Sequence, residues 1–344
     1  MTRAVFAIPG DKDRRTGGFI YEARVLKTLN EIGCRTQHLQ LPESFPDPSA
    51  ADMAATVDAL RAVSPRQPII LDGLVFGAID PDGLAAVDAP IIAMIHHPLG
   101  LETGLTPQRA AFLLANETAA LKHVAQVIVP SPETARVLRN DFDADPAKIT
   151  IAPPGFDRPA VARNPVDPPL ILSVGLLAPR KGHDVLLDAL ADMVDVPWQA
   201  QIVGKEYDAR YANALSRQAG RLGIENRVAF LGEVGPAQLA ERFNAASVFA
   251  LATRYEGYGM VLSEAMMFGL PVVSCSVGAV PTTVGDAAIL VPPDDPLQFS
   301  LALRSVLEGT DTASRLSALS KAKADTLPQW RDTAQIFAEV IDGL

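Results

Sequence analysis

Residues 246–275 read ASVFALATRYEGYGMVLSEAMMFGLPVVSC, and three structural signals follow one another in this stretch. The apolar run 246–252 predicts a short buried strand, and helical periodicity begins near Met260. The helix is expected to stop at Gly269-Leu270-Pro271, and the apolar run 271–275 predicts another strand. The order strand, loop, helix, strand is the unit from which parallel α/β sheets are built.

The loop and helix of this unit carry two glutamates, Glu256 and Glu264, with seven residues between them. Gly257 and Gly259 let the loop turn and approach a ligand closely. Backbone N–H groups at the helix start can hold a phosphate, and a carboxylate can accept two hydrogen bonds from a sugar diol. The segment has the outline of a nucleotide-sugar site, although, taken alone, Glu256 is better explained as a turn cap and Glu264 as a solvated helix residue.

Strands and amphipathic helices alternate along the whole chain, which predicts parallel sheets covered by helices. The first half has expected strands at residues 4–8, 35–39, 69–71, 91–95, 126–129 and 149–151, with helices at 18–32, 107–124 and 132–141. The second half has further expected strands at 170–174, 199–203, 228–231 and 288–291, helices at 184–193, 209–222 and 236–245, and two helices after the turn 292–296.

The proline-rich segment 164–169 is too rigid for a helix or a strand and is the best candidate for a linker. A chain of 344 residues is long enough for two domains on either side of it. We therefore expect an α/β protein of two Rossmann-like, doubly wound domains, residues 1–166 and 167–327, that face each other across a cleft. Such a cleft is a common place for a ligand.

The composition narrows the classes of partner. A formal net charge of −10 argues against a nucleic-acid partner, because phosphate binding needs a basic face. Cys34 and Cys275 have no metal-ligand spacing and suit buried positions in a reducing cytoplasm. The longest apolar run, 170–178, is about half of a membrane-spanning helix, so no transmembrane segment is expected. Peripheral contact with the inner face of a membrane stays open.

Two adjacent cations, Arg180 and Lys181, follow the strand expected at 170–174. At the carboxyl end of a strand they could neutralise a departing diphosphate, although they could equally be solvated loop charges. Asp184, a few residues later, is expected to favour the start of a helix through the helix dipole.

The first half offers a second group of candidates. Gly17 and Gly18 follow the first strand and open a helix, so the backbone there can pass close to a substrate. His96 and His97 follow the strand at 91–95, and this strand-end position favours a functional role for one of the two over a structural one. Residues 100–105, which include Glu102, are expected to shape an acceptor pocket.

Several common catalytic motifs are absent. The sequence has no HExxH, no CxxC, no serine nucleophile elbow, and no GxGxxG after the first strand of either half. Protease, zinc-enzyme and α/β-hydrolase interpretations therefore find no support. No metal site is expected.

Together these residues resemble the family-4 retaining glycosyltransferases of GT-B fold, and the resemblance extends over most of the chain. The most specific match runs from Glu256 to Glu264 and is similar to the E-x7-E motif of that family. Residues 179–184, PRKGHD, match next best, and residues 152–157 and 227–232 give support. Leu176 departs from the pattern, because many members have an arginine there; Arg180 would then supply that charge.

The resemblance implies a role for each matching residue. Glu256 would hold hydroxyls of the donor sugar, Glu264 the ribose, and His96 would lie by the anomeric carbon. Arg180 and Lys181 would hold the diphosphate. The other donor contacts implied are Gly17, Gly18, Gly257, Gly259, Met260 and Val261 near the phosphates and Arg227 and Val228 near the base. His97 and Glu102 are the expected acceptor contacts, and the C-terminal helix, 328–344, would cross back to the first domain.

We expect a metal-independent retaining glycosyltransferase that uses no cofactor and moves a sugar from a nucleoside diphosphate donor to an acceptor hydroxyl. No carboxylate nucleophile is evident, so a front-face reaction is preferred over a covalent one. The acceptor stays open between a lipid, a polysaccharide and a small metabolite, and the oligomeric state is unknown. The alternatives are a non-catalytic nucleotide-sugar binding protein and a GT-B phosphorylase or nucleotide-sugar hydrolase.

Overall fold

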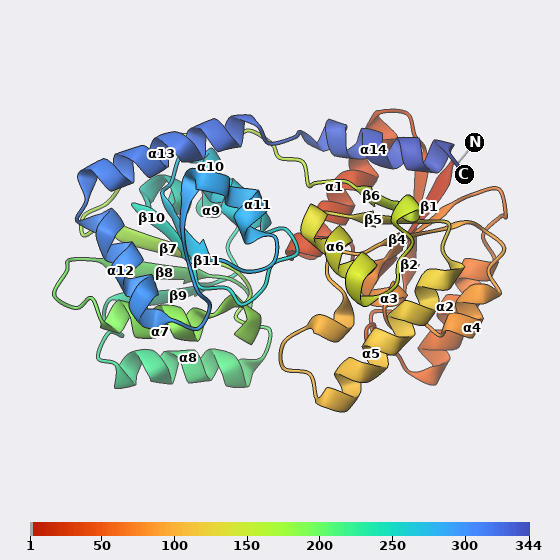
Figure 1. Ribbon diagram of the computed structural model, residues 1–344, viewed down its shortest axis with the longest axis horizontal. Coiled ribbons are helices and arrows are strands. Elements are labelled where there is room, and N and C mark those ends of the chain that lie inside the picture. Colours follow the sequence, from red (N-terminus) through yellow and green to blue (C-terminus); the bar gives the residue numbers. More distant parts are fainter. Residues whose placement is uncertain (1–2) are drawn as a thin grey trace. The chain divides into compact units, whose positions relative to one another are not determined.

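The computed structural model describes residues 3–344 and consists of two compact units (Figure 1). The first unit runs to Phe156 and also contains Pro328–Leu344, whereas the second is Asp157–Leu327. The boundary thus falls before the expected linker. The reason is that the linker already pairs with the second unit: Asn164 N donates to the carbonyl of Asn244 at 2.9 Å, and Val166 N donates to the carbonyl of Ala245 at 3.1 Å.

The first unit is built on six parallel strands in the order β2-β1-β3-β4-β5-β6. Its central strands are buried along their whole length and are apolar apart from Asp72, which ends one of them, as expected for a sheet covered on both faces. The strands are β1 (Ala4–Pro9), β2 (Thr36–Leu41), β3 (Ile69–Asp72), β4 (Ile91–Met94), β5 (Gln126–Val129) and β6 (Ile149–Ile151). The helices between them are α1 (Gly17–Glu31), α2 (Ala50–Arg61), α3 (Gly73–Phe76), α4 (Pro81–Ala85), α5 (Pro107–Ala120) and α6 (Pro132–Asp141).

The second unit has six parallel strands in the order β12-β11-β10-β7-β8-β9. The strands are β7 (Leu170–Val174), β8 (Gln199–Val203), β9 (Val228–Gly232), β10 (Val248–Leu251), β11 (Val272–Cys275) and β12 (Ala288–Val291). The helices are α7 (His183–Ala191), α8 (Ala209–Arg221), α9 (Pro236–Ala245), α10 (Met260–Met267), α11 (Val280–Val284), α12 (Pro296–Leu307) and α13 (Thr310–Asp325). The two parallel sheets with flanking helices confirm the predicted fold class.

The last helix, α14 (Trp330–Asp342), packs on α1 of the first unit (Figure 1). Its buried side chains include Trp330 and Phe337, whose rings lie 5.8 and 6.2 Å from the ring of Tyr21. Thr333 Oγ1 donates to the carbonyl of Pro153 at 2.8 Å. Three helices therefore follow β12, not the expected two, because Gly309 separates α12 from α13 and Pro328 lies between α13 and α14.

Each sheet has one place where the order of the strands reverses. In the first sheet β1 has β2 on one side and β3 on the other, and in the second sheet β7 lies between β8 and β10. At such a switch point the loops after the two strands diverge and leave a crevice at the carboxyl ends. Within residues 3–344, no helix combines the length and apolar character needed to cross a membrane.

Candidate active site

The loops after β7 and β10 meet at the switch point of the second sheet. The turn Pro179–Lys181 follows β7 and ends at Gly182, which has a φ of 63°. A Cβ on Gly182 would lie 1.8 Å from the carbonyl oxygen of Ala252, which directly follows β10. Only glycine fits both this left-handed conformation and this close approach. The contact holds the two cations of the β7 loop beside the β10 loop, which carries Glu256.

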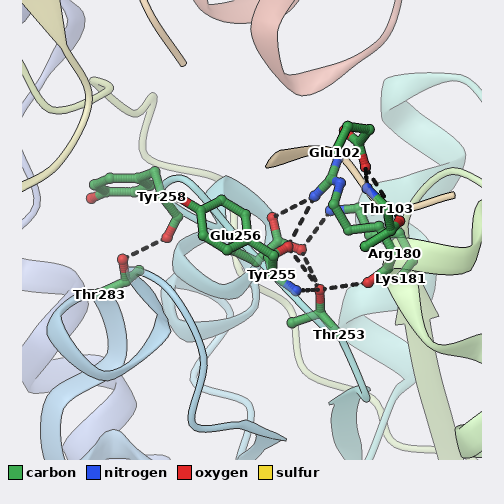
Figure 2. Close-up of polar contacts among 9 residues, drawn as sticks. All are labelled: Glu102, Thr103, Arg180, Lys181, Thr253, Tyr255, Glu256, Tyr258 and Thr283. Carbon is green, nitrogen blue, oxygen red and sulfur yellow. Dashed lines mark hydrogen bonds and ion pairs between the residues drawn. The ribbon is translucent and has the colours of Figure 1, made fainter. Parts of the chain in front are cut away.

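Lys181 and Glu256 form an ion pair at this place (Figure 2). Lys181 Nζ lies 2.6 Å from Glu256 Oε1, and Arg180 Nη1 lies 3.8 Å from Glu256 Oε2. The hydroxyl of Thr253 lies 3.0 Å from Glu256 Oε1. Arg180 also donates to the carbonyl of Tyr255 at 3.0 Å. The structure thus brings Arg180, Lys181 and Glu256 into direct contact.

The charges of this cluster are fixed by the two cations. Glu256 is only 5% exposed. Burial raises the pKa of Glu256, but Lys181 and Arg180 lower it by more, so that its pKa lies below the ordinary value of 4.5. Glu256 is therefore an ionised hydrogen-bond acceptor at neutral pH. A buried carboxylate of this kind can accept hydrogen bonds from ligand hydroxyls without changing its charge.

Arg254 ties three loops together behind the ion pair. Its guanidinium binds both oxygens of Asp184 at 3.0 and 2.8 Å, and its Nε lies 2.7 Å from Asp294 in the loop after β12. It also donates to the carbonyl of Pro179. Asp184 accepts a further hydrogen bond from Tyr211 of α8 at 2.9 Å. Beyond its expected place in the first turn of α7, Asp184 is thus one anchor of the β10 loop.

Helix α10 begins directly after this loop. Gly259, with a φ of 85°, precedes it, and Met260 and Val261 are its first residues. Backbone N–H groups at such a position have no partner within the helix and can bind an anion. The other glycine of the loop, Gly257, lies next to Glu256. These four residues therefore lie between the two glutamates of the motif, as the sequence predicts.

Glu264 lies in the second turn of α10 and is partly buried. Its carboxyl group makes no hydrogen bond or ion pair with the part of the chain that the structure describes. Burial alone raises its pKa to about 7. A partly buried acid without a protein partner is costly unless a ligand satisfies it. Glu264 is therefore suited to receive hydroxyl groups from outside the protein.

The first unit contains a separate group at the carboxyl ends of β3 and β4. His96 follows β4, and a Cβ on Gly18 would lie 3.3 Å from its ring. His96 Nε2 lies 3.3 Å from Oε1 of Glu22, which comes from α1 and is fully buried. Asp72 ends β3, caps α3 and interacts with Glu22. Burial lowers the pKa of His96 to about 4, so its imidazole is neutral at physiological pH.

Four expected residues, Gly17, Gly18, His97 and Glu102, belong to the elements around this group. Gly17 and Gly18 are the first residues of α1, as predicted. His97 directly follows His96 and is partly buried. Glu102 follows the turn Leu99–Leu101 and accepts hydrogen bonds from the backbone N–H and the hydroxyl of Thr103 at 3.1 and 3.4 Å.

Arg227 and Val228 do not join either group. Val228 begins β9, and Arg227 donates to the carbonyls of Trp198, Val194 and Val196, which precede β8. The Arg227 guanidinium also lies over the Trp198 ring, 3.7 Å from its centre. In a parallel sheet the starts of the strands lie at the edge opposite to their carboxyl ends. We therefore leave Arg227 and Val228 out of the candidate site and assign Arg227 a structural role.

Sequence reasoning missed Glu22, Asp72 and Arg254. Asp72 had a signal, because it directly follows a strand and precedes a helix, the position of a capping residue. No feature of the sequence marks Glu22, because a glutamate in a helix is usually exposed to solvent. Its burial becomes visible only when α1 is seen packed in the structure. Arg254 was visible within the motif, but its three acidic and carbonyl partners lie far away in the sequence.

Two family models match consecutive parts of the chain. Residues 157–323 match the family described as glycosyl transferases group 1, and residues 48–158 match glycosyltransferase family 4. The chain therefore belongs to these GT-B glycosyltransferases, and the family resemblance of the sequence is confirmed.

Individual relatives agree with this assignment. The chain is 32% identical over 257 residues to D-inositol 3-phosphate glycosyltransferase of Streptomyces scabiei, covering 68% of this chain and 57% of that protein. It thus spans little more than half the length of such curated relatives. A solved sucrose-phosphate synthase from Thermosynechococcus elongatus has a TM-score of 0.85 at 20% identity over 99% of this chain and 98% of its own. The Anabaena protein HepE in complex with UDP-glucose has a TM-score of 0.79 at 18% identity over 99% of this chain and all of its own.

Proposed function

We propose that this protein is a glycosyltransferase that moves a sugar from a nucleoside diphosphate donor to an acceptor hydroxyl with retention of configuration. The observation that carries the proposal is the cluster that the partly buried cations Lys181 and Arg180 form with the buried Glu256 at the switch point of the second sheet. Two cations and an ionised acid at one strand edge suit a ligand that has both phosphates and hydroxyls. The activity named for the relatives supports the same conclusion.

In this proposal the second unit holds the donor. Lys181 and Arg180 bind the diphosphate together with the backbone N–H groups of 259–261, and Glu256 accepts hydroxyls of the sugar. Glu264 accepts the two ribose hydroxyls, which satisfies its otherwise unpartnered carboxyl group. The nucleotide is a uridine diphosphate by analogy with HepE, which was solved with UDP-glucose. Arg180 supplies the charge of the arginine that many family members have at the position of Leu176.

The reaction we propose is a front-face substitution without a resident metal. As the bond to the anomeric carbon breaks, negative charge develops on the departing diphosphate. Lys181 and Arg180 stabilise that charge, which is the main electrostatic contribution of the protein to the transition state. The acceptor hydroxyl attacks from the same face and releases its proton to a phosphate oxygen of the leaving group. No carboxylate forms a covalent intermediate in this scheme.

The first unit would hold the acceptor, with His97 and Glu102 as candidate contacts. Two of the relatives are named for phosphorylated small molecules, inositol 3-phosphate and sucrose-phosphate. We therefore propose phosphorylated sugars and polyols as the first acceptors to test, ahead of lipids and polysaccharides.

A panel of nucleotide sugars tests the donor, since a donor that binds only the folded state raises its melting temperature. The stabilising donor is then radiolabelled and incubated with each acceptor. We expect a larger labelled product only with an acceptor present. Release of free sugar with every acceptor would indicate a hydrolase, transfer to inorganic phosphate would indicate a phosphorylase, and tight binding without turnover would indicate a binding protein.

A further inference from the structure

Two buried carboxyl groups lie behind His96, and the proposed transfer gives them no role. Glu22 of α1 is fully buried, and Asp72 at the end of β3 is 3% exposed. Glu22 Oε1 lies 3.3 Å from His96 Nε2. The other oxygen of Glu22 has no hydrogen-bond partner within the described residues. Such a pair is costly to bury, so it calls for an explanation.

The orientation of the His96 ring is fixed from several sides. Gly18 contacts the ring through the close approach described above, and a larger residue there would push it away. Tyr21 meets the ring edge-on, with the ring centres 5.1 Å apart and the planes at 82°. Tyr21 is itself held by a hydrogen bond of 2.8 Å to the carbonyl of Ala152. Nε2 of His96 therefore faces Glu22, while its Nδ1 has no hydrogen-bond partner among residues 3–344.

The position of one hydrogen follows from the charges around the ring. Burial raises the pKa of Glu22 to about 7, against the lowering effect of a hydrogen bond from Asp72, and raises that of Asp72 well above its ordinary value, so both carboxyl groups are mainly protonated at about pH 6. His96 is neutral and has one ring hydrogen. A protonated Glu22 donates to Nε2, which leaves the ring hydrogen on Nδ1.

We propose that Glu22, supported by Asp72, is a positioning residue that fixes His96 in the tautomer whose Nδ1 carries the hydrogen. His96 then offers a hydrogen-bond donor to an oxygen of the substrate and does not act as a general base. The ligand chemistry that matches this donor is a hydroxyl or phosphate oxygen with a free lone pair. The part of this inference that concerns substrate rests on the proposed function, whereas the tautomer itself does not.

Nitrogen NMR of the full chain with 15N-labelled histidine tests the tautomer without any activity. His96 is assigned by comparison with His96→Gln, and spectra are recorded at about pH 6, between the pKa values of His96 and Glu22. We expect the shift of a protonated nitrogen at Nδ1 and of an unprotonated nitrogen at Nε2. Protonation at Nε2 in the unmodified protein would overturn the inference.

Two substitutions of Glu22 extend the test. Glu22→Gln retains an N–H donor toward Nε2 and should keep the tautomer, whereas Glu22→Leu has no donor and should lose the preference. The matched control is Glu117→Gln, since Glu117 is another fully buried acid of the first unit, bonded to Leu99 N at 3.2 Å. It should leave the His96 spectrum unchanged.

Activity adds a second readout. We expect kcat to stay within about threefold in Glu22→Gln and to fall about tenfold or more in Glu22→Leu, with the donor KM unchanged in both, because one neutral hydrogen bond is at stake. A Glu22→Gln variant that loses the tautomer would overturn the inference. If Glu22→Leu does not fold, the spectra of the unmodified and Gln forms still decide. If no transfer is found at all, the proposed function fails while the NMR result stands.

Discussion

At the scale of single residues, Glu256 and Glu264 are two acids of one motif with opposite electrostatic environments. Glu256 contacts two cations and has a lowered pKa, whereas the carboxyl group of Glu264 is partly buried, has no partner among the described residues and has a pKa of about 7. The same residue type can therefore serve two ligand groups in two ways. Substitution of each acid by glutamine should separate these roles.

Glu256→Gln removes the charge that faces Lys181. We expect kcat to fall about 100-fold or more, because the sugar loses a charged hydrogen-bond acceptor and the ion pair between Glu256 and Lys181 is lost. Steady-state transfer assays measure this loss, and urea unfolding checks that the variant is folded. An unchanged kcat in a folded variant would contradict the placement of Glu256 at the donor sugar.

The raised pKa of Glu264 predicts that donor binding depends on pH. In the free protein its pKa is about 7, and hydrogen bonds from ribose hydroxyls favour the ionised form and so lower the pKa in the complex. Donor affinity should therefore rise as the pH increases toward 7 and level off above it, with proton release on binding below that point. Calorimetry in buffers of different ionisation enthalpy measures the proton release.

The control for this prediction is Glu264→Gln, which removes the titrating group. It should bind the donor with an affinity that does not change between about pH 5.5 and 8, since glutamine has no charge to lose. Proton release that persists in Glu264→Gln would assign the titration to another residue.

The sequence alone points to most of the proposed donor residues, because the motif from Glu256 to Glu264 is contiguous and its chemistry is local. The base contact of Arg227 was implied by the family resemblance alone, whereas in the structure Arg227 precedes β9 and binds carbonyls that precede β8. Sequence reasoning also missed Glu22 and Asp72. These two residues meet only because β3 lies beside β1 in the sheet, and strand order is not visible in local pattern.

At the scale of elements, the expected strands and long helices of both halves are present, with ends that differ by a few residues. Hydrophobic periodicity over such lengths is a local property, so these elements can be predicted from the sequence. The short helices α3, α4 and α11 have too few residues to show a period. The unit boundary was displaced, because the proline-rich segment forms backbone hydrogen bonds to the second unit that its composition does not reveal.

The close approach of the β7 and β10 loops gives a test at this scale. Gly182→Ala should destabilise the protein by about 3 kcal/mol or more, because the new Cβ meets the Ala252 carbonyl in addition to the strain of its positive φ. We also expect a loss of transfer activity, since the turn that carries Arg180 and Lys181 must shift. Urea unfolding measures the first effect and kinetics the second.

Gly223 provides the matched control, because it has a φ of 70° and nothing within 4 Å of an added Cβ. Gly223→Ala should cost only the conformational strain, about 1 kcal/mol, and should leave transfer unchanged. Equal effects of the two substitutions would show that the contact with Ala252 contributes nothing.

At the scale of the whole molecule, the first unit depends on a helix that lies beyond the second unit in the sequence. Removal of residues 328–344 deletes Trp330 and Phe337 from their packing on α1. Loss of two buried aromatic side chains at about 3–5 kcal/mol each is comparable to the stability of a domain, about 5–15 kcal/mol. We expect the truncated first unit to unfold while the second unit keeps its structure.

Calorimetry of the truncated chain should therefore show one cooperative transition where the full chain shows the unfolding of both units. Titration with the nucleotide alone should still detect binding, because the proposed donor residues all lie within Asp157–Leu327, apart from Gly17 and Gly18. If the truncated chain still shows the cooperative unfolding transition of the first unit, α14 is dispensable for the stability of that unit.

The placement of α14 also has a consequence for biosynthesis. Because the ribosome makes the chain in order, the first unit must wait for all of Asp157–Leu327 before its last helix exists. At about 5–20 residues per second, that wait is on the order of ten seconds. Throughout it the apolar face of α1 lacks its cover, so chains that end before Trp330 and have been released from the ribosome should be cut by protease in the first unit and protected in the second. For this fold, the half that is translated first is the half that is completed last.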